Sequence, residues 1–117
     1  MIRNTTLLAT LLPLVLLGNT WQVGPGQPYT LPSQVSALVG DGDTVNIAAG
    51  TYPGDVARWQ ANDLVLRGVG GFAHLESNGN AWGGKAIWVI QGNNNTVEWI
   101  EFSECSVPDD NGAGIRL

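Results

Sequence analysis

Short apolar runs, separated by corners rich in Gly and Asn, organise the second half of the chain. The run AIWVI at residues 86–90 is dense in β-formers and too short for a helix. The run VEWIEF at residues 97–102 alternates imperfectly. We expect its Val97, Ile100 and Phe102 to face inward and both of its glutamates to face outward. The Gly and the three Asn between the runs tolerate left-handed backbone, so a sharp turn is expected there.

The rest of the chain contains one short helical pattern and several short strand patterns. LPSQVSALV at residues 31–39 predicts an amphipathic helix, with Ser33 as its N-cap and Gly40 as its stop signal. The Gly- and Pro-rich residues 21–28 are interpreted as a lead-in, with Val23 as a candidate strand start. No long helical stretch separates the strands, so a sheet built from βαβ units is not expected. Further short strands are expected at residues 44–47, 63–68, 74–76, 105–107 and 114–117.

Two internal similarities indicate stacked coils. NDLVLRG and NTVEWIEF share an Asn, a polar residue and an apolar run, which sets Leu64 on Val97, 33 positions away. AIWVIQG and GAGIRL match when Trp88 is set on Ile115, 27 positions away. Periods of about 20 to 50 residues in short strands are typical of solenoids. We therefore predict an all-β β-solenoid of about two to three coils; an antiparallel sandwich is the alternative.

A resemblance to a known class follows from two longer stretches. SALVGDGDTVNIAAGTY at residues 36–52 resembles the opening coil of right-handed parallel β-helix proteins of the pectin-lyase-like class, in which a short helix precedes a GDTI…GTY strand and corner. VEWIEFSECSVPDDNGAGIRL at residues 97–117 resembles the repeating coils of secreted members. The resemblance implies a right-handed parallel β-helix behind one short N-terminal capping helix. It does not specify an activity, because the class contains lyases, hydrolases, epimerases and members of unknown function.

The resemblance also implies how the coils are arranged and that more coils follow. The chain would end in mid-strand without a terminal cap, so residues 21–117 are expected to be the N-terminal coils of a truncated β-helix domain. The open C-terminal coil is expected to allow self-association. The successive sides would be residues 64–66, 74–76 and 86–90, then 97–102 and 105–107, with 115–117 returning to the side of 86–90.

The first residues have the order of a secretory signal. A short positive start at residues 1–3 precedes a leucine-rich core at residues 7–17 and a polar, partly small-residue exit at residues 18–20. The core is shorter than the roughly 20 residues that a membrane-spanning helix needs. We interpret residues 1–20 as a signal peptide, with a membrane anchor or a buried helix as alternatives. The mature protein would be secreted, periplasmic or on the cell surface, with no membrane contact after cleavage.

The charge balance and the counts of Cys and His exclude several kinds of site. The whole chain has five basic and ten acidic residues, a balance that argues against nucleic acid and mildly against unaided binding of a polyanion. Cys105 is the only cysteine and His74 the only histidine, which excludes an internal disulfide and a multi-histidine zinc site. The GVGG at residues 68–71 lacks the spacing of a nucleotide-binding loop and is interpreted as a tight corner. Residues 41–43 (DGD) lack the further ligands of a calcium loop. No metal or cofactor is therefore predicted from the residues. Bound Ca²⁺ is implied only by the resemblance.

Five residues are candidates for binding substrate. Among the five tryptophans, Trp59 and Trp82 are expected to be exposed and able to stack on sugar rings, whereas the two within strands are expected to pack. The resemblance implies that loops beside the last strand line a substrate cleft, which makes Asp109, Asp110 and Arg116 candidates, with a solvated turn as the alternative. Catalytic residues of the class would lie on later coils.

These observations favour an exported β-helix protein that binds or modifies polysaccharide. If it is an enzyme, a polysaccharide lyase or a glycoside hydrolase is expected. The main alternative is a non-catalytic β-solenoid that acts as a surface or adhesion module, and a small independent domain is a third reading.

Overall fold

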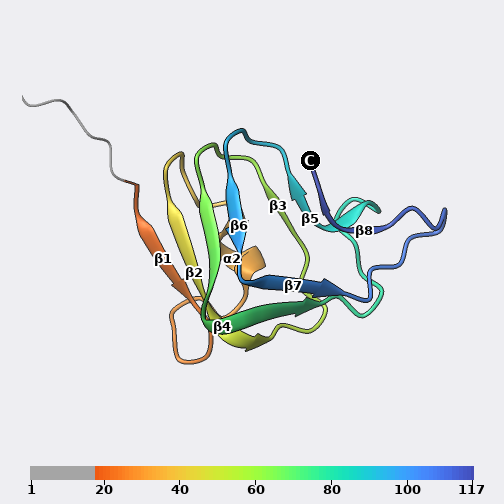
Figure 1. The fold of residues 1–117 in the computed structure, drawn as a ribbon, viewed down its shortest axis with the longest axis horizontal. Helices are drawn as coiled ribbons and strands as arrows, with labels where there is room; N and C mark the ends of the chain where they lie inside the picture. The colour runs from red at the N-terminus through yellow and green to blue at the C-terminus, as the bar shows by residue number, and fades with distance from the viewer. Residues whose placement is uncertain (1–17) are drawn as a thin grey trace, which may run out of the picture.

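The computed structural model describes residues 18–117, and nearly all of their regular structure is β-strand (Figure 1). Every pairing between the named strands is parallel. The elements are β1 (Thr20–Val23), α2 (Pro32–Ser36), β2 (Thr44–Thr51), β3 (Ala57–Trp59), β4 (Val65–Glu76), β5 (Ala86–Ile90), β6 (Thr96–Glu98), β7 (Ile100–Ser103) and β8 (Ala113–Arg116).

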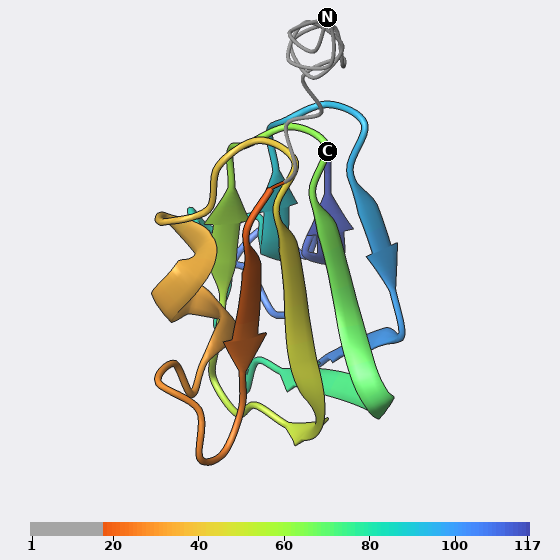
Figure 2. The same ribbon diagram turned by 90° about the vertical axis from the view of Figure 1, so that its left-hand side faces the viewer.

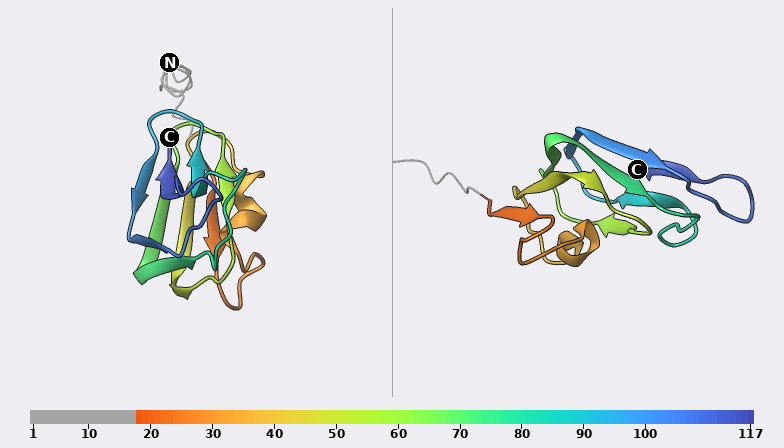
Figure 3. Two further views of the ribbon diagram at one scale, coloured as in Figure 1. Left: turned by 90° about the vertical axis from the view of Figure 1, so that its right-hand side faces the viewer. Right: turned by 90° about the horizontal axis from the view of Figure 1, so that it is seen from below.

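The strands form two sheets, and from β2 onward the chain passes from one sheet to the other and back. Sheet A has the order β1-β2-β4-β6, with β7 also paired to β4, and sheet B has the order β3-β5-β8. Because each return to a sheet adds a parallel strand beside the previous one, the chain is a β-solenoid of about four turns. Figure 2 shows the two sheets facing each other across the core, and Figure 3 shows the last coil, with β6 to β8, at the end of the stack opposite β1. The predicted all-β solenoid is confirmed.

The stack begins earlier than the sequence pattern indicates. β1 begins at Thr20, the last residue of the predicted signal peptide, and continues into the segment interpreted as a lead-in, where Val23 is the end and not the start of the strand. β1 pairs with β2 from Thr20 opposite Thr44 to Val23 opposite Ile47. Val23 is buried, so this short strand already contributes to the core. The number of turns therefore exceeds the two to three that were expected.

Sheet A bends sharply along its length, as Figure 1 shows for β4. β4 continues through twelve residues, but Gly70 and Gly71 have positive φ values of 84° and 141° at the bend. The next coil breaks at the same place, because Trp99 has a φ of 58° and separates β6 from β7. The expectation that residues 97–102 form one side is thus wrong. They form two sides, and residues 105–107 lie outside any strand.

The register confirms one predicted match and corrects the other. Trp88 pairs with Ile115, as the 27-residue match predicts. Val97 pairs with Leu66 and not with Leu64. Leu64 instead donates its backbone N–H to the Asn95 side chain at 2.8 Å, so it belongs to the corner and not to the strand.

The core lies between the sheets and consists of rows of inward side chains. In sheet A, Val45 and Leu66 are fully buried and Val97 continues their row. Val97, Ile100 and Phe102 pack on this core while Glu98 and Glu101 are exposed, so the predicted inward and outward positions are confirmed. In sheet B, Trp59 and Trp88 meet edge to face, with ring centroids 5.1 Å apart. These rows bury each coil on its neighbours.

Polar side chains hold the corner before each sheet A strand in a ladder from coil to coil. Asp41 accepts a hydrogen bond from the backbone N–H of Asn62 at 2.8 Å, and Asn62 accepts one from the backbone N–H of Asn93 at 2.8 Å. Asn95 also donates to the carbonyl oxygen of Ala61 at 3.2 Å. Backbone groups that a corner leaves without strand partners are satisfied in this way.

The helix is shorter than the sequence pattern predicts and begins earlier. Leu31 is its N-cap residue and Ala37 its C-cap residue, in place of Ser33 and Gly40. Ser33 is unavailable as the cap because its backbone N–H and its hydroxyl both donate to the buried Asp55. α2 packs against β3, beside the N-terminal edge of sheet B (Figure 2). Within residues 18–117 no helix has the length and apolarity needed to cross a membrane.

Candidate functional site

The outer face of sheet B gathers two of the arginines. Arg58 on β3 pairs in register with Val89 on β5, which pairs with Arg116 on β8. Because side chains alternate along a strand, the inward direction of Ala57 and Trp59 turns Arg58 outward. Two strand spacings set the two arginine backbones roughly 10 Å apart along the stack. We call Arg58, Arg116 and the neighbouring Trp82 the sheet B face; Val89, between the two arginines in the register, is only 6% exposed.

Trp82 contributes an aromatic surface to the sheet B face. The Arg58 guanidinium carbon lies 4.8 Å from the centroid of the Trp82 ring, which is a cation–π contact. The backbone of Trp82 is held by an antiparallel bridge to Ala86, with its N–H donating to the Ala86 carbonyl at 2.7 Å. Beside this pair lies a hollow of about 210 Å³, lined by Ser33, Ser36, Ala37, Val56, Ala57, Arg58, Gln60 and Trp82. Hydroxyl, amide and guanidinium groups therefore surround one aromatic surface.

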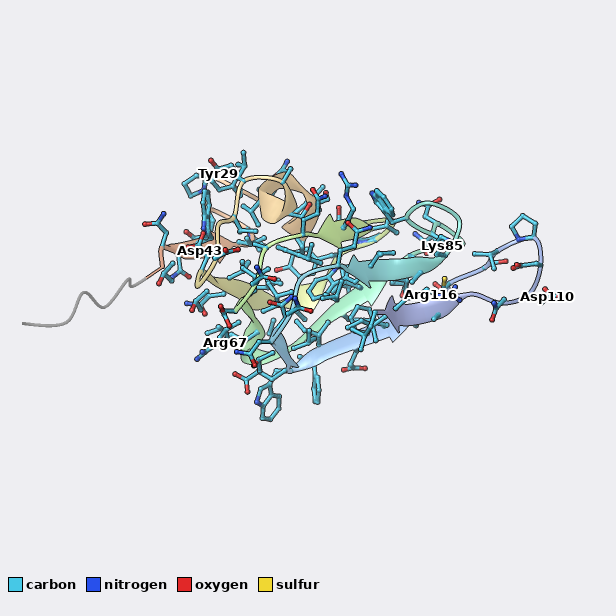
Figure 4. The ribbon with its side chains drawn as sticks, turned by 90° about the horizontal axis from the view of Figure 1, so that it is seen from above. Tyr29, Asp43, Arg67, Lys85, Asp110 and Arg116 are labelled. Carbon is cyan, nitrogen blue, oxygen red and sulfur yellow. The ribbon has the colours of Figure 1, made fainter. Side chains whose placement is uncertain are left out.

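The structure separates the predicted acidic candidates from the arginine of the same loop. Arg116 donates through Nη2 to the carbonyl oxygen of Asn111 at 2.8 Å, and Asp109 accepts from the backbone N–H of Asn111 at 3.1 Å. Asp110 has a φ of 58° and lies at the tip of the loop, well away from Arg116 in Figure 4. Asp109 and Asp110 are both exposed. Arg116 thus anchors the loop to β8, and the two carboxylates point to solvent at its tip.

The structure changes which tryptophans are accessible. Trp59 is fully buried because it is an inward residue of β3, so the prediction that it is exposed for sugar stacking is wrong. Trp82 is half-buried and Trp88 fully buried. Trp99, which was expected to pack, is 57% exposed because its backbone turns the corner between β6 and β7.

A second aromatic surface surrounds this corner. The rings of Phe72 and Trp99 have centroids 4.9 Å apart and planes inclined by 50°. Arg67 Nε lies 3.6 Å from Glu98 Oε1 at the edge of the same region. A hollow of about 570 Å³ is lined by residues 67–71, Glu98 and Trp99. We call Arg67, Val69, Phe72, Glu98 and Trp99 the Trp99 corner; sequence reasoning missed it, although Gly70 and Gly71 signalled a bend nearby.

The two buried carboxylates stabilise the N-terminal coils. Asp43 accepts hydrogen bonds from the backbone of Asn19 and Gly40 and from the Trp21 indole, at 2.7 to 2.8 Å. Burial acts to raise the pKa of Asp43, but these three donors together lower it below its ordinary value. Burial raises the pKa of Asp55 despite the opposing hydrogen bonds from Ser33. Because N–H donors occupy the carboxylate oxygens of Asp43, we assign this residue a structural role.

His74 has a neighbour that the sequence did not reveal. Its Nε2 lies 2.6 Å from the hydroxyl oxygen of Ser103 on the adjacent strand. A nucleophilic serine needs a base that a third group orients. Within residues 18–117 no hydrogen bond joins His74 to a carboxylate, so we assign this pair to the stability of the sheet.

The part of the chain that the structure describes contains no group of three or more His, Cys, Asp or Glu side chains placed to hold a metal ion. Comparisons of the chain with protein-family models, with curated proteins and with solved structures found no match. The geometry of the two aromatic surfaces therefore carries the interpretation of function.

Proposed function

We propose that this chain is an exported, right-handed parallel β-helix protein that binds polysaccharide along the sheet B face. The observation that carries the proposal is the Arg58 guanidinium stacked on Trp82 beside a polar hollow. An indole ring offers an apolar surface to the C–H face of a sugar, while a guanidinium donates hydrogen bonds to hydroxyl or carboxylate oxygens. Arg116, further along the same row, adds donors for a ligand that extends along the stack.

Two features of the architecture support the right-handed coil and the N-terminal cap in this proposal. Connections between parallel strands of one sheet are right-handed in about 98% of cases, which favours a right-handed coil. α2 lies beside β3 at the N-terminal edge of sheet B, where an N-terminal cap would shield a free strand edge. Export rests on the signal-like residues 1–20, of which residues 1–17 lie outside the described part.

The proposal is tested by following the indole N–H signals of ¹⁵N-labelled protein during titration with a panel of neutral and acidic oligosaccharides. The chain has five tryptophans, so each site has its own reporter. We expect a ligand of the sheet B face to shift the Trp82 signal while the buried Trp59 and Trp88 stay in place. Trp82→Ala should weaken this binding at least tenfold. A panel in which no oligosaccharide shifts the Trp82 signal would refute the function.

The same panel separates binding from modification. Incubation of each polysaccharide with the protein, followed by chromatography of the products, reports whether chains are shortened. Unchanged polysaccharide together with a shifted Trp82 signal would support a binding module, as in the alternative of a surface or adhesion protein. New reducing or unsaturated ends would support an enzyme.

A further inference from the structure

We propose that the Trp99 corner is a second, separate binding site, which takes a neutral sugar ring on the Trp99 indole. Only the ligand class rests on the proposed polysaccharide function; the site itself rests on different residues, in a different sheet. Arg67 at this corner and Arg116 on the sheet B face lie well apart in Figure 4. A ligand at one site therefore does not contact the other.

The three apolar side chains of the corner have little role in the core. Trp99 is 57% exposed, Phe72 49% and Val69 46%. They gather at one bend and not along the inward rows. A contiguous apolar surface of this kind, with charged residues at its rim, marks a binding site more often than an isolated exposed side chain does.

The backbone at Trp99 is held in one position at the corner. Trp99 has a φ of 58°, a conformation that bulky residues rarely adopt. Its carbonyl oxygen accepts a hydrogen bond from the backbone N–H of Ala73 at 3.0 Å, and β6 and β7 hold it from both sides. A Cβ added to Gly68 would lie 2.2 Å from the same carbonyl oxygen, so the close approach requires glycine there. Strain that the surrounding strands maintain in this way is typical of functional positions.

The rim of the corner selects a neutral ligand with several hydroxyl groups. Arg67 and Glu98 have side chains 42% and 46% exposed, and their nearest polar atoms are 3.6 Å apart. This separation exceeds that of a normal hydrogen bond, so the acceptors of the carboxylate remain available. Arg67 Nε is itself buried, so only the terminal nitrogens of the guanidinium can donate to a ligand. Their charges cancel, and the chain as a whole is acidic, so the corner does not attract a polyanion. A sugar ring can place its C–H face on the Trp99 indole and its hydroxyl groups beside Arg67 and Glu98.

The test uses Trp99→Asn, because Asn tolerates positive φ and keeps the corner foldable. Neutral oligosaccharides are titrated into ¹⁵N-labelled wild-type protein, Trp99→Asn and Trp82→Ala. We expect the Trp99 indole signal to shift in wild-type protein and in Trp82→Ala. In Trp99→Asn, which lacks this indole, the backbone N–H signals of the lining residues 67–71 report binding, and the affinity should fall at least tenfold. Arg67→Gln, which removes the charge and shortens the donor, should weaken binding in the same direction.

The outcomes distinguish this site from the sheet B face and from other occupants. A Trp82 shift without a Trp99 shift overturns the corner site and leaves the proposed function standing. A Trp99 shift that survives Trp82→Ala supports the corner even if the sheet B face proves wrong. A Trp99 signal that responds only to lipid vesicles, or only to rising protein concentration, would refute the sugar site in favour of a membrane or a second copy of the chain.

Discussion

Replacing Asn95 by Ala should destabilise the protein strongly for a residue in a corner. The Asn95 side chain accepts a hydrogen bond from the backbone N–H of Leu64 at 2.8 Å and donates one to the carbonyl oxygen of Ala61 at 3.2 Å. It therefore ties two consecutive coils together through a single amide. Alanine has no side-chain acceptor or donor, so the N–H of Leu64 and the carbonyl oxygen of Ala61 both lose their partner.

The expected loss follows from the burial of those groups. Leu64 is fully buried, so its N–H cannot turn to water when Asn95 is removed. An unsatisfied buried donor or acceptor costs about 1 to 3 kcal/mol. Since Ala61 and Asn95 are only half-buried, water offsets part of the second loss. We expect the free energy of unfolding to fall by about 2 to 4 kcal/mol.

Asn93→Ala is the matched control. Asn93 is exposed, and only its backbone takes part in the ladder: its N–H donates to the Asn62 side chain at 2.8 Å and its carbonyl oxygen accepts from the backbone N–H of Asp63 at 2.9 Å. Urea unfolding followed by tryptophan fluorescence measures both variants against the wild type. Asn93→Ala should change stability by less than about 0.5 kcal/mol, as typical of surface substitutions. Equal stabilities of the two variants would refute the ladder as a source of stability.

Three further predictions follow from other contacts. Because the pKa of Asp43 is lowered in the folded state, its stabilisation is present above its ordinary value of 3.8 and is lost as the pH falls through the folded pKa. Asp43→Asn should therefore flatten the loss of stability in acid, and an unchanged slope in urea titrations below pH 5 would count against it. Gly68→Ala should cost several times more than Gly40→Ala, since an added Cβ meets the Trp99 carbonyl oxygen at 2.2 Å in one case and the Asp43 carboxylate at 4.0 Å in the other. Self-association through the last coil stays a prediction: its inward Ile115 is 37% exposed, so Ile115→Lys should lower the apparent mass in light scattering, and a wild-type monomer at tens of micromolar would contradict it.

The sequence by itself determined the fold class, because the strand patterns are local and similar segments recur 27 and 33 positions apart. A run such as AIWVI is too short for a helix, and Gly and Asn at the corners permit the turns that stacked coils need. The pairing of Trp88 with Ile115 was also predictable, since both lie in strands whose apolar patterns match. The charge balance argued against nucleic acid, and the single His and single Cys excluded a multi-histidine zinc site and an internal disulfide.

Only the tertiary structure decided which tryptophans are accessible and how the coils align. Trp59 and Trp99 exchange their expected roles, because the inward face of a three-residue strand and the position of a corner depend on the neighbouring coils. The contact of His74 with Ser103, 29 residues away, likewise needs two coils in register. That register is set by long-range hydrogen bonds such as the one from Leu64 to Asn95, and local residue preferences carry no information about such bonds.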